Sequence, residues 1–227
     1  MGQRDKSSVS EFFRHITLSI KTASKSHKFT VGLSGGIGSG KTVASDHFAT
    51  FGIDIIDTDV IARDIVKPNQ PALVKLVSEF GNTILTDNGE LNRAELRQIA
   101  FSNAQNKAKL DNITHPAIHK ASLEKIAQSS SPYCIVVVPL LSKESAFSAM
   151  MDRILIVSAE LETKISRVEK RSQLSREEVL RIMSTQLSDE QRAEFADDII
   201  ENNSSLKHVY TEVERLHQYY LKLSLER

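Results

Sequence analysis

From Phe29 onward, the chain alternates between short apolar runs and longer amphipathic stretches. The apolar runs are rich in branched aliphatic side chains, which predicts buried strands. Strands are predicted at residues 29–34, 53–57, 134–138 and 153–158, with a last one around 199–200. Helices are predicted up to about residue 51, then over 60–67, most of 71–128, 160–171, 176–187, 189–195 and 205–224. Because helices separate successive strands, we expect an α/β protein with a parallel sheet and right-handed crossovers.

Local signals mark several helix boundaries. Ser175 with Glu178, and Ser188 with Gln191, have the spacing of a capping box, in which two side chains satisfy N–H groups at the start of a helix. Pro116 is predicted to occupy the first position of the last helix in the long helical region, where its missing N–H does no harm.

Composition narrows the class of protein. The chain has 227 residues, 40% of them hydrophobic, which is enough for one sizeable core. Its 29 basic and 29 acidic residues balance, and this disfavours a protein whose main work is to coat nucleic acid. The single cysteine, Cys134, has no internal disulfide partner, so a cytoplasmic location is predicted. No apolar run approaches the ~20 residues that span a bilayer, and the sequence leaves open whether the chain forms an oligomer.

The first 28 residues differ in charge from the rest of the chain. They hold six basic and two acidic residues, a net charge of +4, so the other 199 residues carry −4. Ser8 and Glu11 have capping-box spacing at the start of a possible short amphipathic helix. A solvated or loosely docked extension is favoured over a helix that binds a partner or a membrane surface. We therefore divide the chain into a basic extension, 1–28, and one domain, 29–227.

A glycine-rich segment between the first strand and the following helix satisfies the P-loop pattern Gly-x-x-x-x-Gly-Lys-[Ser/Thr]. It reads Gly35-Gly-Ile-Gly-Ser-Gly-Lys-Thr42. Glycines let the backbone wrap closely around phosphate oxygens, and the start of the helix adds its positive dipole end. Lys41 is expected to bridge the β- and γ-phosphates, and the Thr42 hydroxyl to ligate Mg²⁺. The segment therefore predicts a nucleotide-binding site.

A P-loop leaves three classes of protein open: a small-molecule kinase, a GTPase-type switch and an ATPase motor. The switch needs an Asn-Lys-x-Asp segment, whereas the nearest candidate, Asn106-Lys107-Ala108-Lys109, ends in Lys and lies in a helical region. The motor needs an apolar strand that ends in Asp, but the strand at 134–138 runs into Pro139. Both classes are therefore disfavoured.

Two features favour a kinase. The second strand ends in Asp57-Thr58-Asp59, at the sheet edge where α/β proteins bind ligands, and a carboxylate there can take the proton of an acceptor hydroxyl. One of the two aspartates is instead expected to cap the following helix. A basic segment follows the fourth strand and suits a mobile lid over phosphates. Its basic residues are Arg167, Lys170, Arg171, Arg176 and Arg181.

Together these segments resemble the dephospho-CoA kinases, from about residue 29 to the C-terminus. The motifs that carry the resemblance are Thr30–Thr42, Asp57-Thr-Asp-Val-Ile-Ala-Arg63, Pro68…Pro71-Ala-Leu73, Ile113-Thr-His-Pro116, Val137-Val-Pro-Leu-Leu141 and Arg192…Ala196-Asp-Asp-Ile-Ile-Glu-Asn202. The P-loop is common to many families, but the ordered set is much more specific.

The resemblance implies ATP-dependent phosphorylation of the ribose 3′-hydroxyl of dephospho-CoA, the last step of coenzyme A synthesis. It implies Mg²⁺ as cofactor, with ATP and dephospho-CoA as the molecules bound. It also implies a P-loop kinase core, a helical substrate-binding insertion around 60–128 and a lid around 162–190.

The resemblance also assigns roles to residues of this chain. Asp59 matches the proposed catalytic base, with Lys41 and Arg171 assisting at the phosphates. The implied ATP-binding residues are Gly36, Ile37, Gly38, Ser39, Gly40, Lys41, Thr42 and Val43, the lid residues Arg167 and Arg171, and Arg192 and Asn202 near the adenine. The implied acceptor pocket comprises Asp57, Asp59, Arg63, His115, Pro139, Leu140 and Leu141. Mg²⁺ is expected on Thr42, and on Asp57 through water.

This chain departs from the family pattern at two positions. Lys143 stands where the family often has Glu, and Val43 follows Thr42 where Thr is common. Another small-molecule kinase, of nucleotide or shikimate type, is the alternative enzyme. A nucleotide-binding module without catalysis is the alternative of a different class.

Overall fold

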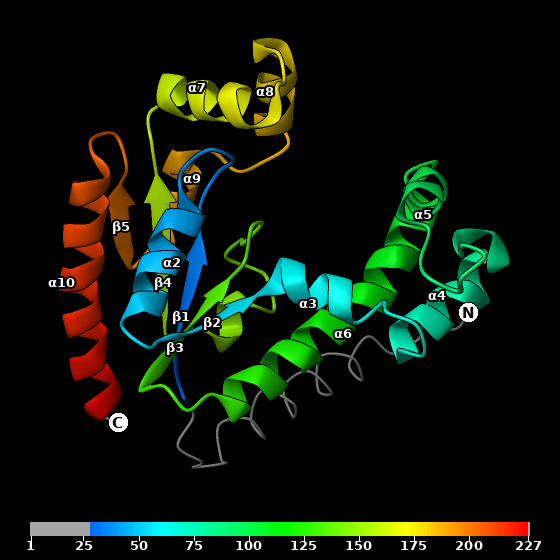
Figure 1. The fold of residues 1–227 in the computed structure, drawn as a ribbon, viewed down its shortest axis with the longest axis horizontal. Coiled ribbons are helices and arrows are strands. Elements are labelled where there is room, and N and C mark those ends of the chain that lie inside the picture. Colours follow the sequence, from blue (N-terminus) through cyan, green and yellow to red (C-terminus); the bar gives the residue numbers. More distant parts are fainter. Residues whose placement is uncertain (1–27, 227) are drawn as a thin grey trace, which may run out of the picture.

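The computed structural model describes residues 28–226, and the predictions for the basic extension fall almost entirely outside this range. One parallel sheet runs through the described part of the chain, with strand order β2-β3-β1-β4-β5 (Figure 1). The strands are β1 (Phe29–Ser34), β2 (Asp54–Asp57), β3 (Tyr133–Val137), β4 (Arg153–Ser158) and β5 (Asp198–Glu201). Every predicted strand is confirmed to within one residue, as is the α/β fold class.

Helices connect the strands as predicted, with some shifted boundaries. They are α2 (Lys41–Thr50), α3 (Thr58–Asp64), α4 (Pro71–Phe80), α5 (Arg93–Ala100), α6 (Ala104–Gln128), α7 (Leu161–Ser172), α8 (Arg176–Met183), α9 (Asp189–Ala193) and α10 (Leu206–Leu225), with single turns η1 (Asn82–Ile84) and η2 (Ser148–Met150). Both predicted capping boxes are present, at the starts of α8 and α9. Helix α3 starts two residues earlier than predicted because Asp57 caps it.

The prediction for Pro116 is wrong: this proline lies inside α6, not at the start of a helix. Proline has no N–H to donate four residues back, so the turn at Pro116 lacks one helical hydrogen bond. The helix continues because its neighbours, Ile113 and Ala117, pack against the core of the insertion. Packing of an apolar face thus outweighs the local preference of proline.

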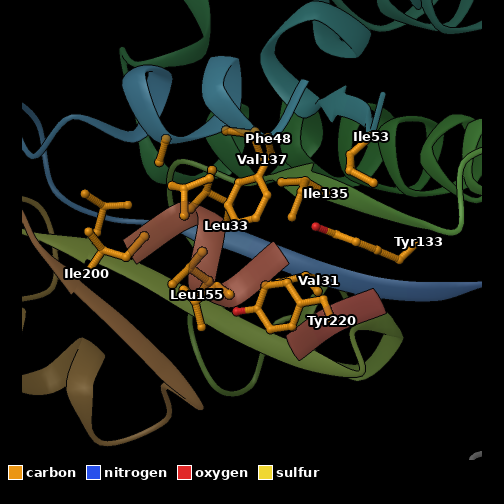
Figure 2. Close-up of a cluster of buried hydrophobic side chains, with 14 of the residues drawn as sticks. Val31, Leu33, Phe48, Ile53, Tyr133, Ile135, Val137, Leu155, Ile200 and Tyr220 are labelled. Atoms are coloured by element: carbon orange, nitrogen blue, oxygen red, sulfur yellow. The ribbon is translucent and has the colours of Figure 1, made fainter. Parts of the chain in front are cut away.

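The first core lies between the sheet and helices α2 and α10 (Figures 1 and 2). Alternate residues of the three central strands point into it: Val31, Leu33, Tyr133, Ile135, Val137, Leu155 and Val157. Phe48 from α2 and Tyr220 from α10 pack on these side chains and are fully buried. This face carries the largest continuous set of buried aliphatic and aromatic groups in the described chain.

The other face of the sheet is also buried, as the continuous β-branched run of β3 predicts. Cys134 and Val136 point into a second core, which α3, α6 and η2 cover with Ile61, Ile126 and Met150. Helices α4, α5 and the far half of α6 extend beyond the sheet as an arm with its own small core (Figure 1). Helices α7 and α8 pack against each other above the carboxyl edge of the sheet.

Among residues 28–226, no helix has the length and apolar character needed to cross a membrane.

One buried histidine beside the first core makes the stability of the fold depend on pH. His217 of α10 is only 7% exposed, and its Nδ1 lies 2.9 Å from the Tyr133 hydroxyl, while the Phe51 ring stacks on it at 4.6 Å. Burial lowers the pKa of His217 and raises the pKa of Tyr133. Burial therefore favours the neutral imidazole in the folded protein, and its Nδ1 shares a hydrogen bond with the Tyr133 hydroxyl.

We expect the free energy of unfolding to decrease as pH falls through the ordinary His pKa of 6.5, because the unfolded chain takes up a proton that buried His217 resists. This contribution is fully present above that pH. Urea unfolding on both sides of pH 6.5 measures it, and His217→Gln, which cannot titrate, should show a smaller loss. An equal loss in the variant would contradict the role of His217.

Candidate active site

The loop from β1 to α2 has a conformation that only glycine adopts readily. Gly38 and Gly40 have φ values of 77° and 99°, in the left-handed region. The space around them is also closed: a Cβ on Gly38 would lie 2.6 Å from the Lys164 carbonyl oxygen, and one on Gly40 would lie 2.2 Å from Asn202 Nδ2. Gly38 and Gly40 are therefore required by backbone shape and by close neighbours.

This loop forms one wall of a cavity of about 280 Å³. Its lining consists of Gly36, Ile37, Gly38, Gly40, Lys41, Thr42 and Val43, together with Arg167 and Arg171 of α7. The fold thus brings most of the predicted ATP-binding residues, including both lid arginines, around one space. Loop amides, the start of α2 and three cationic side chains give this space the chemistry of a phosphate site.

Lys41 lies at the centre of this site. Its Nζ donates to the carbonyl oxygens of Gly35 and Gly36, at 2.7 and 3.1 Å. Burial and then the nearby charge of Arg192 lower the pKa of Lys41 to about 8, against an opposing effect of Asp59. An ammonium group surrounded by positive charge is well placed to receive an anion.

The two aspartates at the end of β2 have different roles. Asp57 Oδ1 accepts the backbone N–H of Asp59 at 2.7 Å, so Asp57 is the residue that caps α3, as expected for one of the pair. The Asp59 carboxylate is not used by the helix cap. Partial burial, and then the charge of Asp57, raise its pKa, while Arg63 and Lys41 act in the opposite direction. Asp59 is therefore a carboxylate of increased basicity beside the phosphate cavity.

Asn202 and Arg167 stabilise the phosphate loop through hydrogen bonds. Asn202 Nδ2 donates to the Ser39 carbonyl oxygen at 2.8 Å. Arg167 Nη2 donates to the Asn202 carbonyl and side-chain oxygens at 3.0 and 3.1 Å. The side chain of Ser39 is buried, so this residue faces the loop interior rather than the cavity. Ser39 and Asn202 therefore hold the loop in shape without lining the cavity.

Arg192 lies against the phosphate loop. Its side chain is 3% exposed, and its Nη1 lies 3.1 Å from Asp189 Oδ1. A Cβ on Gly36 would lie 3.3 Å from the same Nη1. The guanidinium is thus close to the phosphate loop, and its charge acts on Lys41; its role near the adenine stays a prediction.

The predicted acceptor residues are only partly brought together. Arg63 lies one turn after Asp59 on α3 and its charge acts on that carboxylate. Leu140 is 70% exposed, whereas Leu141 is 2% exposed and packs in the second core. His115 is exposed on α6, with Nε2 3.7 Å from Asp111 Oδ1, and is not among the residues that line the phosphate cavity.

Sequence reasoning missed three polar residues at the loop. The Ile37 N–H donates to Gln186 Oε1 at 3.1 Å, and Asp189 pairs with both Lys164 and Arg192. The capping box at Ser188 marks the start of α9 in the sequence, but no spacing rule indicates that this helix packs on Gly36.

A parallel sheet, a P-loop at the end of its central strand and an unpaired carboxylate after β2, two strands away at the same edge of the sheet, define the class of P-loop kinases. The sequence matches the dephospho-CoA kinase family over residues 29–208, and the chain belongs to that family. This confirms the resemblance, the fold and the enzyme class predicted from the sequence, and the alternative kinases are not favoured.

Individual relatives agree with the family match. The dephospho-CoA kinase of Psychrobacter cryohalolentis is 43% identical over 202 residues, 88% of each chain. That of Aromatoleum aromaticum is 41% identical over 86% of this chain and 96% of its own. Among solved structures, a Thermus thermophilus protein has a TM-score of 0.72 at 27% identity, covering 85% of this chain and 98% of that one. The dephospho-CoA kinase from Campylobacter jejuni has a TM-score of 0.65 at 26% identity, covering 85% and 97%.

Nucleotide affinity should decrease as pH rises above about 8, because Lys41 then loses the proton that lets it pair with phosphate. Below that pH the ammonium form predominates and binding is at its full strength. Calorimetric titration with ADP across this range measures the effect. Lys41→Arg keeps its charge at every pH used, so its affinity should vary less with pH even if it is weaker overall. A wild-type affinity that stays constant well above pH 8 would contradict this role for Lys41.

Proposed function

We propose that this chain transfers the γ-phosphoryl group of ATP to the ribose 3′-hydroxyl of dephospho-CoA, giving CoA and ADP. The observation that carries the proposal is the position of Asp59 at the carboxyl end of β2, within electrostatic reach of Lys41 in the phosphate loop. An acceptor hydroxyl between these two groups faces a base on one side and the bound phosphates on the other.

The loop and its cationic neighbours hold the phosphates of ATP. Backbone N–H groups of the loop and Lys41 contact the phosphate oxygens, and Arg171, which is exposed and lines the cavity, approaches from the lid. These groups are present before the substrate binds. Their positive charge is therefore available to stabilise the charge that develops on the transferring group.

Asp59 acts as the general base. Its carboxylate accepts the proton of the 3′-hydroxyl while the oxygen forms a bond to the γ-phosphorus, and the bond to the bridging oxygen of ADP breaks. Partial burial and Asp57 raise the pKa of Asp59, and this makes its carboxylate a stronger base. Asp57 keeps α3 in place through its cap, and so fixes the position of Asp59.

The residues at this site fit Mg²⁺. Thr42 is exposed at the second position of α2, and Asp57 and Asp59 add carboxylate oxygens at the end of β2, the ligand type that this ion prefers. Thr42 would hold the ion directly and Asp57 through water. When bound, the ion supplies positive charge that neutralises phosphate oxygens.

The helical arm offers space for the rest of the acceptor. A cavity of about 240 Å³ lies between α3, α4, α5 and α6, with a mostly apolar lining that includes Arg93 and Arg97. Ala62 belongs to this lining and lies one turn after Asp59 on α3, so the cavity begins close to the catalytic carboxylate. An apolar wall with two guanidinium groups suits a molecule that has both an extended arm and phosphates. We assign the arm, about 60–128, to the acceptor, and the segment about 162–190 to a lid, in an enzyme of the cytoplasm.

Replacing the two central groups should reduce turnover without unfolding the protein. Asp59→Asn is expected to lower kcat by about 10²–10⁴-fold, because the base is lost, and Lys41→Ala by about 10²–10³-fold. Asp64→Asn, on the exposed side of the same helix, is the matched control and should retain near-normal turnover. If Asp59→Asn kept near-normal turnover, the assignment of the base would be wrong.

A panel of acceptors tests the substrate. ADP release is measured with dephospho-CoA, a nucleoside monophosphate and shikimate, and mass spectrometry identifies the phosphorylated product. We expect turnover with dephospho-CoA and a product phosphorylated on the ribose. Phosphorylation of the nucleoside monophosphate but not of dephospho-CoA would overturn the proposal, as would ATP binding without turnover of any acceptor.

A further inference from the structure

Gln186 makes a contact that the catalytic scheme does not use. Its side-chain oxygen accepts the backbone N–H of Ile37 at 3.1 Å, and Ile37 belongs to the phosphate loop. Gln186 follows the end of α8, so this hydrogen bond joins the lid segment directly to the loop. A neutral amide oxygen thus accepts an N–H of Ile37, a residue that lines the phosphate cavity, while Gln186 itself lines a second cavity of about 560 Å³ that also includes Gly36 and Ile37.

This contact lies next to Gly36, one of the two residues whose carbonyl oxygens accept from Lys41. Lys41 Nζ, which reaches the β- and γ-phosphates in P-loops, lies on the carbonyl oxygens of Gly35 and Gly36. A Cβ on Gly36 would meet Arg192 Nη1 at 3.3 Å and Gln186 Oε1 at 3.8 Å. The carboxamide of Gln186 and the Arg192 guanidinium therefore both lie next to Gly36, whose carbonyl oxygen accepts from Lys41 Nζ.

The segment that carries Gln186 is held in place by charge. Asp189 joins Lys164 of α7 and Arg192 of α9, with N–O distances of 2.8 and 3.1 Å. These three side chains are at most 20% exposed, so solvent screens the pairs only weakly. Ile37 adds an apolar contact, since it packs against the small core that α7 and α8 share. These ion pairs and this apolar contact hold the segment of Gln186 against the loop, so its carboxamide stays close to the Ile37 N–H.

We propose that Gln186 recognises the γ-phosphate of ATP, accepting a hydrogen bond from Ile37 without nucleotide and donating one to the phosphate when ATP is bound. A carboxamide has both an acceptor and two donors, so a rotation of its terminal group exchanges the two roles. A phosphate oxygen is a charged acceptor and forms a stronger hydrogen bond with the Ile37 N–H than an amide oxygen does. ADP lacks the terminal phosphate and leaves the Gln186–Ile37 contact intact.

This inference rests on the proposed function, and the test separates the two because it measures binding rather than turnover. Calorimetry with ADP and with AMP-PNP, each with magnesium chloride, compares the wild type with Gln186→Glu. The carboxylate keeps an acceptor for the Ile37 N–H and has no donor for phosphate. We expect AMP-PNP affinity to fall by about tenfold or more, the scale of a charged hydrogen bond, and ADP affinity to change much less.

Gln191→Glu is the matched control. It adds the same charge five residues away on the same segment, and Glu serves as well as Gln in the capping box that Gln191 forms with Ser188. Its ratio of AMP-PNP to ADP affinity should equal that of the wild type. Equal weakening of both nucleotides by Gln186→Glu, no weakening at all, or the same selective loss in Gln191→Glu would overturn the proposal.

A second measurement on the wild type does not depend on any variant. The backbone amide resonance of Ile37 reports its hydrogen-bond acceptor directly. It should shift strongly on addition of AMP-PNP and only slightly on addition of ADP. Equal shifts with the two nucleotides would contradict a role specific to the γ-phosphate, whereas failure of the acceptor panel would reject the proposed function and leave this result standing.

Discussion

The five strands run parallel, so their carboxyl ends meet at one edge of the sheet, and the site depends on this arrangement. β1 leads into the phosphate loop and β2 ends at Asp57, with β3 between them in the sheet. β5 ends beside Asn202, which braces the loop through Ser39. Residues that are far apart in sequence therefore reach the same place because of strand order, and the two buried cores keep the strands in that order.

Electrostatics explains why these neighbours act on phosphate. The charges of Arg192 and Arg171 lower the pKa of Lys41. A bound anion would reduce this repulsion between the three positive groups. Asp59 is at the rim of this positive region and has the opposite shift, a raised pKa. The net charge of the chain is zero, so phosphate binding depends on a few positioned groups rather than on an overall basic surface.

Much of this could be predicted from the sequence because the signals are local. The strands, both capping boxes and the phosphate loop follow from apolar runs and residue spacing. Pro116 was predicted wrongly because packing in the insertion, a tertiary effect, keeps α6 continuous across it. Gln186 and the position of Arg192 beside Gly36 could not be predicted, since they depend on how α9 packs on the loop, and no spacing in the sequence encodes that contact.

The central claim is that the sheet edge holds Asp59 against the acceptor hydroxyl while the loop holds the phosphates. A crystal structure with AMP-PNP, magnesium and dephospho-CoA tests it most directly. The account predicts that the ribose 3′-oxygen lies within hydrogen-bonding distance of the Asp59 carboxylate, about 2.6–3.2 Å, and faces the γ-phosphorus. A 3′-oxygen that contacts another base, or that points away from the γ-phosphorus with Asp59 bound only to solvent, would contradict it.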